Sequence, residues 1–166
     1  PSAILQNKQF SIAVSMFNIV LHQPEIPQNT GSIGRLCVNN NCKLHLIRPL
    51  GFETSDYYLK RSGLDYWEKL NPDFYDDWQD FKIKNRSMRL FLFSTKGMRK
   101  HTEVDWQPQD GLVFGSETSG LPRPLIEEYL DSSIRIPMIG DFTRSLNLAQ
   151  SVAIGLYEGL RVVHNW

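Results

Sequence analysis

The chain has 166 residues, its 18 Lys and Arg balance its 18 Asp and Glu, and 41% of its residues are hydrophobic. This length suits one domain with a sizeable core. No apolar run approaches the roughly 18 residues that a membrane helix needs, so we expect no membrane span. The two cysteines, Cys37 and Cys42, are too few for a disulfide scaffold and are typical of a reducing cytoplasm. The histidines show no zinc-site spacing, so we expect no metal.

Residues 1–15 lack the basic cluster and the long apolar stretch of a signal peptide. We therefore treat 1–15 as a leader of unknown role and assign 16–166 to a single domain.

Apolar runs alternate with helical patterns from residue 17 onward. The strand-like runs are 17–21, 43–47, 89–95, 111–115 and 134–137. The helical patterns begin near Asn29 or Thr30 and recur at 54–63, 74–81, 122–130 and 145–165. This alternation predicts an α/β fold, a mostly parallel sheet with helices on both faces.

The neutral total charge argues weakly against a nucleic-acid-binding protein. The segment Lys82 to Lys100, however, holds seven basic residues and no acidic one. Such a segment can meet RNA phosphates, or it can simply be a solvated face.

Three loops follow strands and precede helices, the place where open parallel sheets bind ligands. In the loop 24–35, Asn29 can cap a helix, and Arg35 can hold a phosphate or make a structural ion pair. In the loop 115–122, Glu117 suits either a helix start or a polar substrate group. In the loop 135–148, Ser145 and Asn147 suit a helix cap or a ligand.

Common ligand-binding and nucleophile motifs are missing. The chain contains no G-x-G-x-x-G, no G-x-x-x-x-G-K-[ST] and no G-x-S-x-G. Composition and spacing alone therefore indicate only an α/β ligand-binding enzyme.

Taken together, the three loops resemble the three signature motifs of the SpoU branch of the SPOUT methyltransferases. The matching segments are PEIPQNTGSIGRLC (24–37), LVFGSETSGLP (112–122) and RIPMIGDFTRSLNLAQSVAIGLYE (135–158). Further segments resemble the small tRNA (cytidine/uridine-34)-2'-O-methyltransferases, namely LHLIRPLGF (44–52), KRSGLDYWE (60–68) and STKG (94–97). The motif 3 loop, 139–145, is about one residue longer than the usual subgroup pattern.

The resemblance implies a C-terminal deep trefoil knot, which general topology rules treat as rare. It also implies a homodimer and the cofactor S-adenosyl-L-methionine. The implied reaction is methyl transfer to a ribose 2'-hydroxyl of tRNA, at wobble nucleotide 34 in the anticodon stem-loop.

Site residues carry over position by position. The resemblance implies cofactor contacts at Phe93, Ser94, Gly97, Gly115, Ile136, Met138, Ser145 and Leu146. It implies catalytic-site roles for Asn29, Arg35, Glu117, Ser145 and Asn147. Arg35 is a poor base because a guanidinium stays protonated, so we expect it to clamp a phosphate or hydroxyl, with Glu117 orienting it or binding a neighbouring polar group. Candidate RNA-binding residues are Lys82, Lys84, Arg86, Arg123 and Arg144.

Two other functions remain open. The chain could methylate ribosomal RNA or another tRNA position, or it could be a non-catalytic RNA-binding module on the same scaffold.

Overall fold

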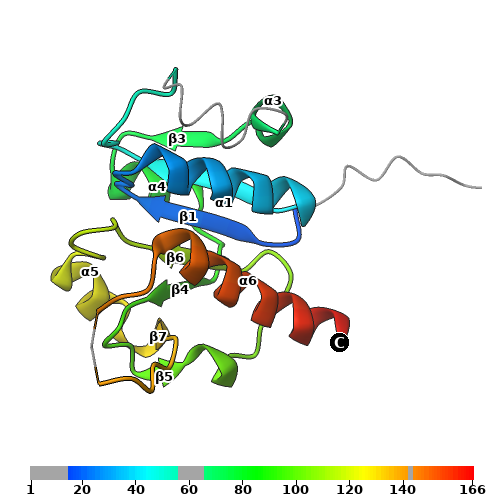
Figure 1. The fold of residues 1–166 in the computed structure, drawn as a ribbon, viewed down its shortest axis with the longest axis vertical. Coiled ribbons are helices and arrows are strands. Elements are labelled where there is room, and N and C mark those ends of the chain that lie inside the picture. Colours follow the sequence, from blue (N-terminus) through cyan, green and yellow to red (C-terminus); the bar gives the residue numbers. More distant parts are fainter. Residues whose placement is uncertain (1–14, 56–65, 142–143) are drawn as a thin grey trace, which may run out of the picture.

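A single parallel sheet organises the chain in the computed structural model, which describes residues 15–55, 66–141 and 144–166. Within these residues, seven strands pair in the order β3-β2-β1-β6-β4-β7-β5 (Figure 1). Every pairing between neighbouring strands is parallel. The strands are β1 Asn18–His22, β2 Lys43–Ile47, β3 Asp73–Tyr75, β4 Leu90–Phe93, β5 Arg99–Lys100, β6 Gly111–Phe114 and β7 Ser133–Arg135.

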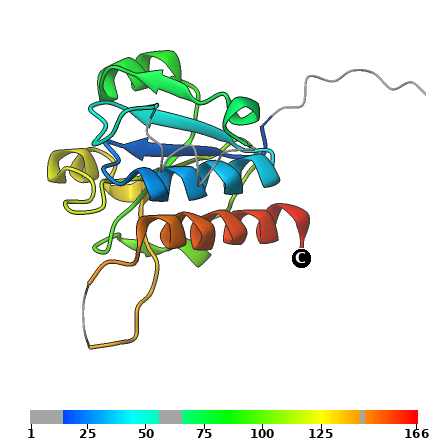
Figure 2. The ribbon, with the colours of Figure 1, turned by 45° about the horizontal axis from the view of Figure 1, so that its top comes forward.

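Helices cover both faces of the sheet. On one face, α1 (Pro27–Asn39) packs against α6 (Leu148–His164), and the two helices lie side by side (Figures 1 and 2). The short α3 (Trp67–Leu70) packs against α1. On the other face lie α4 (Trp78–Lys84) and α5 (Arg123–Glu128), whose apolar residues share a second core cluster. Two 3-10 turns complete the described elements, η1 (His101–Glu103) and η2 (Leu130–Ser132).

The central strand β1 is buried on both sides. Ile19 belongs to the core under α1 and α6, and Val20 belongs to the core under α4 and α5. Both side chains are fully buried, which is why the strand reads as a continuous apolar run. The expected parallel α/β architecture is confirmed.

Two short strands were not expected from the sequence. β3 has three residues and β5 has two, and both contain charged residues. Phe74, placed by its spacing in a helix with Trp78 and Phe81, lies in β3, so this helix starts only at Trp78. A strand this short has no periodicity of its own, and pairing with a neighbouring strand decides its conformation.

Three expected helix starts are wrong or untested. α1 begins at Pro27, so Asn29 and Thr30 lie inside it and Asn29 is not its cap. Ser145 is not helical either, because α6 begins at Leu148 after the cap residue Asn147. The helix expected over 54–63 falls mostly outside the described residues.

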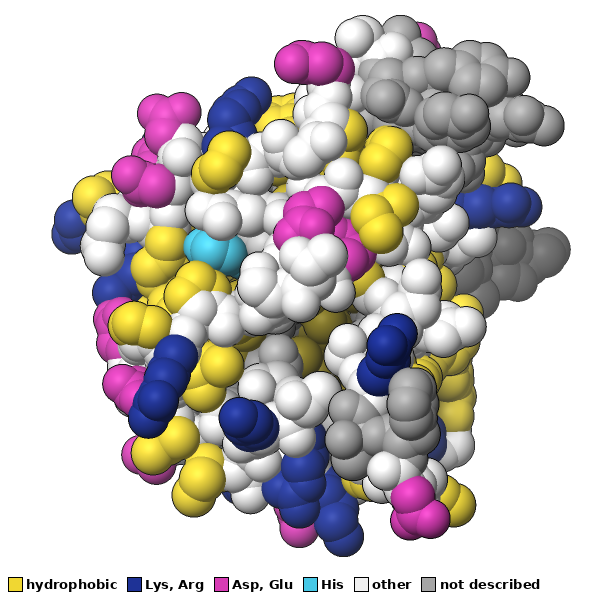
Figure 3. Space-filling view, turned by 60° about the vertical axis from the view of Figure 1, so that its left-hand side comes forward, with side chains coloured by type: hydrophobic (Ala, Val, Ile, Leu, Met, Phe, Trp, Pro, Cys, Tyr) yellow, Lys and Arg dark blue, Asp and Glu magenta, His cyan; other side chains and the backbone are white. Residues whose placement is uncertain are grey.

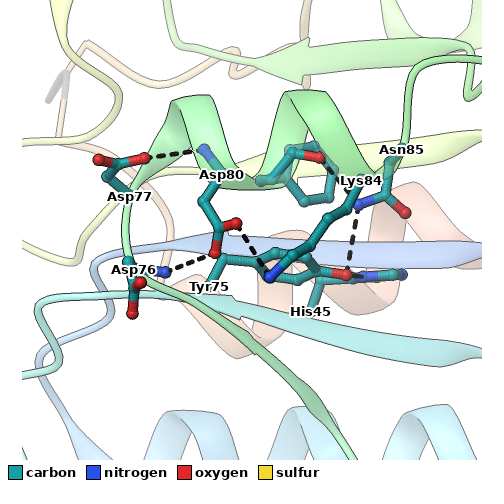
Figure 4. Close-up of polar contacts among 8 residues, drawn as sticks. His45, Tyr75, Asp76, Asp77, Asp80, Lys84 and Asn85 are labelled. Atoms are coloured by element: carbon teal, nitrogen blue, oxygen red, sulfur yellow. Dashed lines mark hydrogen bonds and ion pairs between the residues drawn. The ribbon is translucent and has the colours of Figure 1, made fainter.

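A buried polar network joins β1, β2 and β3. The Nδ1 atom of His45 lies 2.8 Å from Tyr75 Oη (Figure 4). Its Nε2 atom lies 2.8 Å from Asn18 Oδ1. Asn18 Nδ2 donates to Gln109 O, so Asn18 Oδ1 accepts from His45 Nε2–H and Tyr75 O–H donates to His45 Nδ1. Desolvation by burial lowers the pKa of His45 to about 4, so the imidazole is neutral at pH 7.

Candidate active site

A cavity of about 750 Å³ opens where β4, β6 and β7 end. Its walls come from the ends of these strands and the segments after them, 93–96, 114–121, 136–138 and 145–148, and from α5. The apolar part of the wall is made of Phe93, Phe114, Leu121, Ile126, Ile136 and Leu148. A cavity of this size with mixed walls suits a nucleoside-sized ligand.

Seven of the eight expected cofactor residues line this cavity. They are Phe93, Ser94, Gly115, Ile136, Met138, Ser145 and Leu146. Their convergence from three distant segments is a result of the strand order, which places β4 between β6 and β7.

Gly97 is the expected cofactor residue that does not line the cavity. Its N–H donates to Ser94 O at 3.0 Å, and a Cβ on Gly97 would collide with the backbone carbonyl of Ile134. A Cβ on Gly115 would likewise collide with the backbone of Gly120. Both glycines therefore allow close approach between backbone segments that shape the cavity.

Glu117 holds the start of α1. Its Oε2 accepts from Glu25 N at 2.6 Å and its Oε1 accepts from Ile26 N at 3.3 Å. The neighbouring Thr118 Oγ1 donates to Glu25 Oε1 at 2.7 Å, so the contact is reciprocal. The carboxylate of Glu117 thus reaches from another loop to hold the two residues that precede α1, near the helix end where negative charge is favourable.

A second link joins α1 to α6. Asn147 Oδ1 accepts from Ala149 N and Gln150 N, at 2.9 and 3.3 Å. Its Nδ2 must then face the other way, where it donates to Asn29 Oδ1 at 3.1 Å. Asn29 consequently turns its own amide nitrogen away from Asn147, as a hydrogen-bond donor.

Arg35 lies apart from the cavity wall. It is exposed on α1, and its guanidinium carbon lies 5.4 Å from the centre of the Tyr66 ring. The expectation that Glu117 orients Arg35 finds no contact among the described residues, since both Glu117 oxygens accept backbone N–H groups. Glu117 instead binds neighbouring polar groups, the alternative left open above.

The expected RNA-binding residues differ in their partners. Lys82 pairs with Glu128 at 2.6 Å, Lys84 with Asp80 at 2.9 Å and Arg123 with Glu127 at 2.8 Å. Hydrogen bonds to Glu128 and Asp80 raise the pKa values of Lys82 and Lys84, respectively. Arg86 is exposed, with no ion pair to the residues that the structure describes, and Arg144 is exposed beside 142–143.

On the side toward which β1 points, Lys and Arg side chains are scattered over the lower half, with acidic ones among them (Figure 3). Within the basic segment, Lys82 and Arg89 pair with Glu128 and Asp110, which only the fold brings near, and Lys84 pairs with Asp80 one helical turn away.

Sequence reasoning missed several residues of the site. Lys96, Thr118 and Glu127 line the cavity. Lys96 and Thr118 adjoin motif residues, which was the available signal. Glu127 lies on α5 outside the motifs, and its place in the cavity wall follows from tertiary packing alone.

The SpoU rRNA methylase family model matches residues 16–157. The chain belongs to this family. Among curated SpoU relatives, the tRNA (cytidine(34)-2'-O)-methyltransferase of Escherichia coli (strain K12) is 44% identical over 147 residues, 88% of this chain and 93% of that protein.

Solved structures agree with this membership. One that is described as giving structural insights into the 2-OH methylation of C/U34 on tRNA is 41% identical, with a TM-score of 0.84 over 92% of this chain and 99% of that one. The SpoU methyltransferase AviRb from Streptomyces viridochromogenes, in complex with the cofactor AdoMet, shares the fold at 23% identity and a TM-score of 0.75, over 89% of this chain and 60% of that one.

Neither a membrane span nor a metal cluster is found in the part of the chain that the structure describes. No helix there is long and apolar enough to cross a bilayer. No group of three or more His, Cys, Asp and Glu side chains there is placed to hold an ion.

Proposed function

We propose that the chain transfers a methyl group from S-adenosylmethionine to the ribose 2'-hydroxyl of nucleotide 34, a cytidine or modified uridine, in tRNA. One observation carries the proposal: residues from motifs 2 and 3 and the loop after β4 converge on one cavity, and side chains of the same motifs hold the start of motif 1. Two relatives that are 41% and 44% identical over most of the chain are connected with 2'-O-methylation at nucleotide 34 of tRNA, and this supports the substrate.

The cavity fits the cofactor by its chemistry. Phe93, Leu121 and Ile136 offer apolar surface to a purine ring, and Ser94 and Ser145 offer hydroxyls to polar groups. When bound, the cofactor supplies an electrophilic methyl on a positively charged sulfur. AviRb, which has the same fold, holds AdoMet, and this supports the assignment.

The protein's part in the reaction is binding and alignment. Apolar walls exclude water, which favours a reaction in which a cation and an oxyanion lose their charges. Holding the 2'-oxygen in line with the methyl group supplies the proximity contribution. Arg35 stays protonated, so we assign it to holding a phosphate or the 2'-oxygen, and Asn29 presents an amide donor. The final proton acceptor is a group that we do not assign.

The proposal includes the assembly and the surroundings of the enzyme. We propose a homodimer, supported by apolar side chains left exposed on and beyond α6, namely Ile154, Tyr157 and Trp166. We also propose the family's trefoil knot around the cavity loops, a cytoplasmic location, and an RNA path over Lys82, Lys84, Arg86, Arg123 and Arg144. Residues 16–166 form the catalytic domain in this proposal.

The decisive experiment mixes the purified protein with labelled S-adenosylmethionine and bulk tRNA from a strain that lacks the activity. Nuclease digestion and mass spectrometry then locate the product. A 2'-O-methyl group at nucleotide 34 is the expected result. Methylation of another ribose, or of ribosomal RNA only, would overturn the assigned position. Absence of both transfer and cofactor binding would instead favour an RNA-binding module.

A further inference from the structure

The two residues that precede α1 are held by a side chain from a distant loop. The N-cap residue of α1 is Ile26, which has no side-chain acceptor, and the first helical residue is a proline. The N–H groups of Glu25 and Ile26 point instead to the carboxylate of Glu117, which lies 92 and 91 residues away in sequence. In a capping box, by contrast, the acceptor for the N–H of the N-cap residue is a side chain three residues later in the same helix.

Both anchors of α1 come from loops that line the cavity. Glu117 and Thr118 are part of the cavity wall and hold residues 25–26. Asn147 lies between the lining residues Leu146 and Leu148, and it holds Asn29. The first turn of α1 is therefore fixed at two points to the cavity that would hold the methyl donor.

We infer that Glu117 is a positioning residue, which sets the place of α1 relative to the cavity and takes no proton from the 2'-hydroxyl. Both of its oxygens accept backbone N–H groups of the segment that enters α1, so the carboxylate is directed at the protein backbone. Its effect on the reaction passes through Asn29 and Arg35, which α1 carries. This inference rests on the proposed function, because it assigns those two residues to the RNA.

The two roles predict different behaviour of Glu117→Gln and Glu117→Ala. A glutamine keeps one oxygen that can accept from the backbone, whereas an alanine keeps none. For a positioning residue we expect Glu117→Gln to retain part of the activity and Glu117→Ala to lose about 10- to 100-fold more, the usual value of a hydrogen bond to a charged group. The loss should appear mainly as a raised KM for tRNA, and the pH profile of kcat should keep its wild-type shape.

A base at Glu117 would give another pattern. Glutamine and alanine variants would then be equally inactive, and the rising limb of the pH profile would disappear. Either result would overturn the inference. Glu103→Gln is the matched control, because the Glu103 carboxylate also accepts from a backbone N–H, that of Lys100 at 2.6 Å, but it neither lines the cavity nor contacts α1; we expect its KM for tRNA to stay within about twofold of wild type.

Amide hydrogen exchange tests the anchor without any turnover. The amides of Glu25 and Ile26 should exchange at least about tenfold faster in Glu117→Ala than in wild type, and their exchange should be unchanged in Glu103→Gln. Unchanged exchange in Glu117→Ala would overturn the inference. If the wild-type protein methylates no RNA, the proposed function fails, but the exchange experiment still decides whether Glu117 holds the turn.

Discussion

The side-chain amide of Asn147 donates to Asn29 Oδ1 at 3.1 Å across 118 residues of sequence. The other end of the same amide caps α6, so one side chain fixes the start of the last helix and the start of the first. Because the two contacts use different atoms of Asn147, different substitutions can remove the cap of α6, the hydrogen bond to Asn29, or both.

Asn147→Asp should preserve stability but reduce methyl transfer. Aspartate is as good an N-cap as asparagine, so the free energy of unfolding should stay within about 0.5 kcal/mol of wild type. It cannot donate to Asn29 Oδ1, so the Asn29 amide loses its fixed orientation and the rate should fall about tenfold. Asn147→Ala should lose the rate and also about 1 kcal/mol of stability. Urea denaturation and a methyl-transfer assay measure the two quantities, and an unchanged rate in Asn147→Asp would contradict the link.

Gly97→Ala should damage the cavity although Gly97 does not line it. The added Cβ would collide with the carbonyl of Ile134, a backbone group that no rotamer change can move. We expect a loss of about 1–3 kcal/mol in the free energy of unfolding and weaker binding of S-adenosylmethionine. Calorimetry measures both. Gly140→Ala is the control, because nothing lies within 4 Å of its added Cβ; equal effects in the two variants would refute this explanation.

The buried His45 predicts a loss of stability in acid. Its pKa is about 4 in the folded protein against 6.5 in the unfolded chain, so the unfolded state binds more protons between these values. The free energy of unfolding should therefore fall as the pH drops from 6.5 to 4, by at most about 3 kcal/mol from this group. Burial also lowers the pKa of His22, which adds in the same direction.

His45→Gln removes the larger of these two contributions and should flatten the pH dependence of unfolding measured by denaturant titration. His164→Gln is the control, because His164 is exposed. This substitution should leave the slope of the free energy of unfolding against pH unchanged. A slope in His45→Gln equal to that of wild type would mean that the pKa of His45 is the same in the folded and unfolded states.

The salt dependence of tRNA binding should distinguish Arg86 from Lys84. Arg86 is exposed without an ion pair to the described residues, whereas Lys84 is already held by Asp80. Each phosphate contact contributes about 0.9 to the slope of log K against log salt, on the double-helix scale. We expect Arg86→Ala to reduce the slope by about this amount and Lys84→Ala by less. A slope unchanged in both variants would exclude this part of the proposed RNA path.

Arg35→Lys tests the proposed clamp. Lysine keeps the charge but not the planar fork of donors, so two-point contact with a phosphate is lost. We expect kcat/KM to fall about 10- to 100-fold while the fold is retained. Nearly normal methyl transfer in Arg35→Lys would show that charge alone suffices at this position.

Much of the site could be predicted from the sequence because its loops follow apolar strands in a parallel sheet. Seven of eight expected cofactor residues line one cavity. The helix starts could not be predicted as well, since local capping rules point to Asn29 and Ser145. The N-cap residue of α1 is Ile26, whose N–H is bound by Glu117, and no pattern around residue 27 contains that information.

What the sequence by itself determined is the order of apolar runs, the parallel α/β class and the three motifs, because these depend on local periodicity and residue identity. What only the tertiary structure decided is which polar groups meet. Glu117 accepts a hydrogen bond from Glu25 N, Asn147 donates one to Asn29, and Lys82 forms an ion pair with Glu128. Each of these contacts joins segments that are distant in the sequence. Burial decides the charge state of His45 in the same way, since desolvation is a property of the packed neighbourhood and not of the residue.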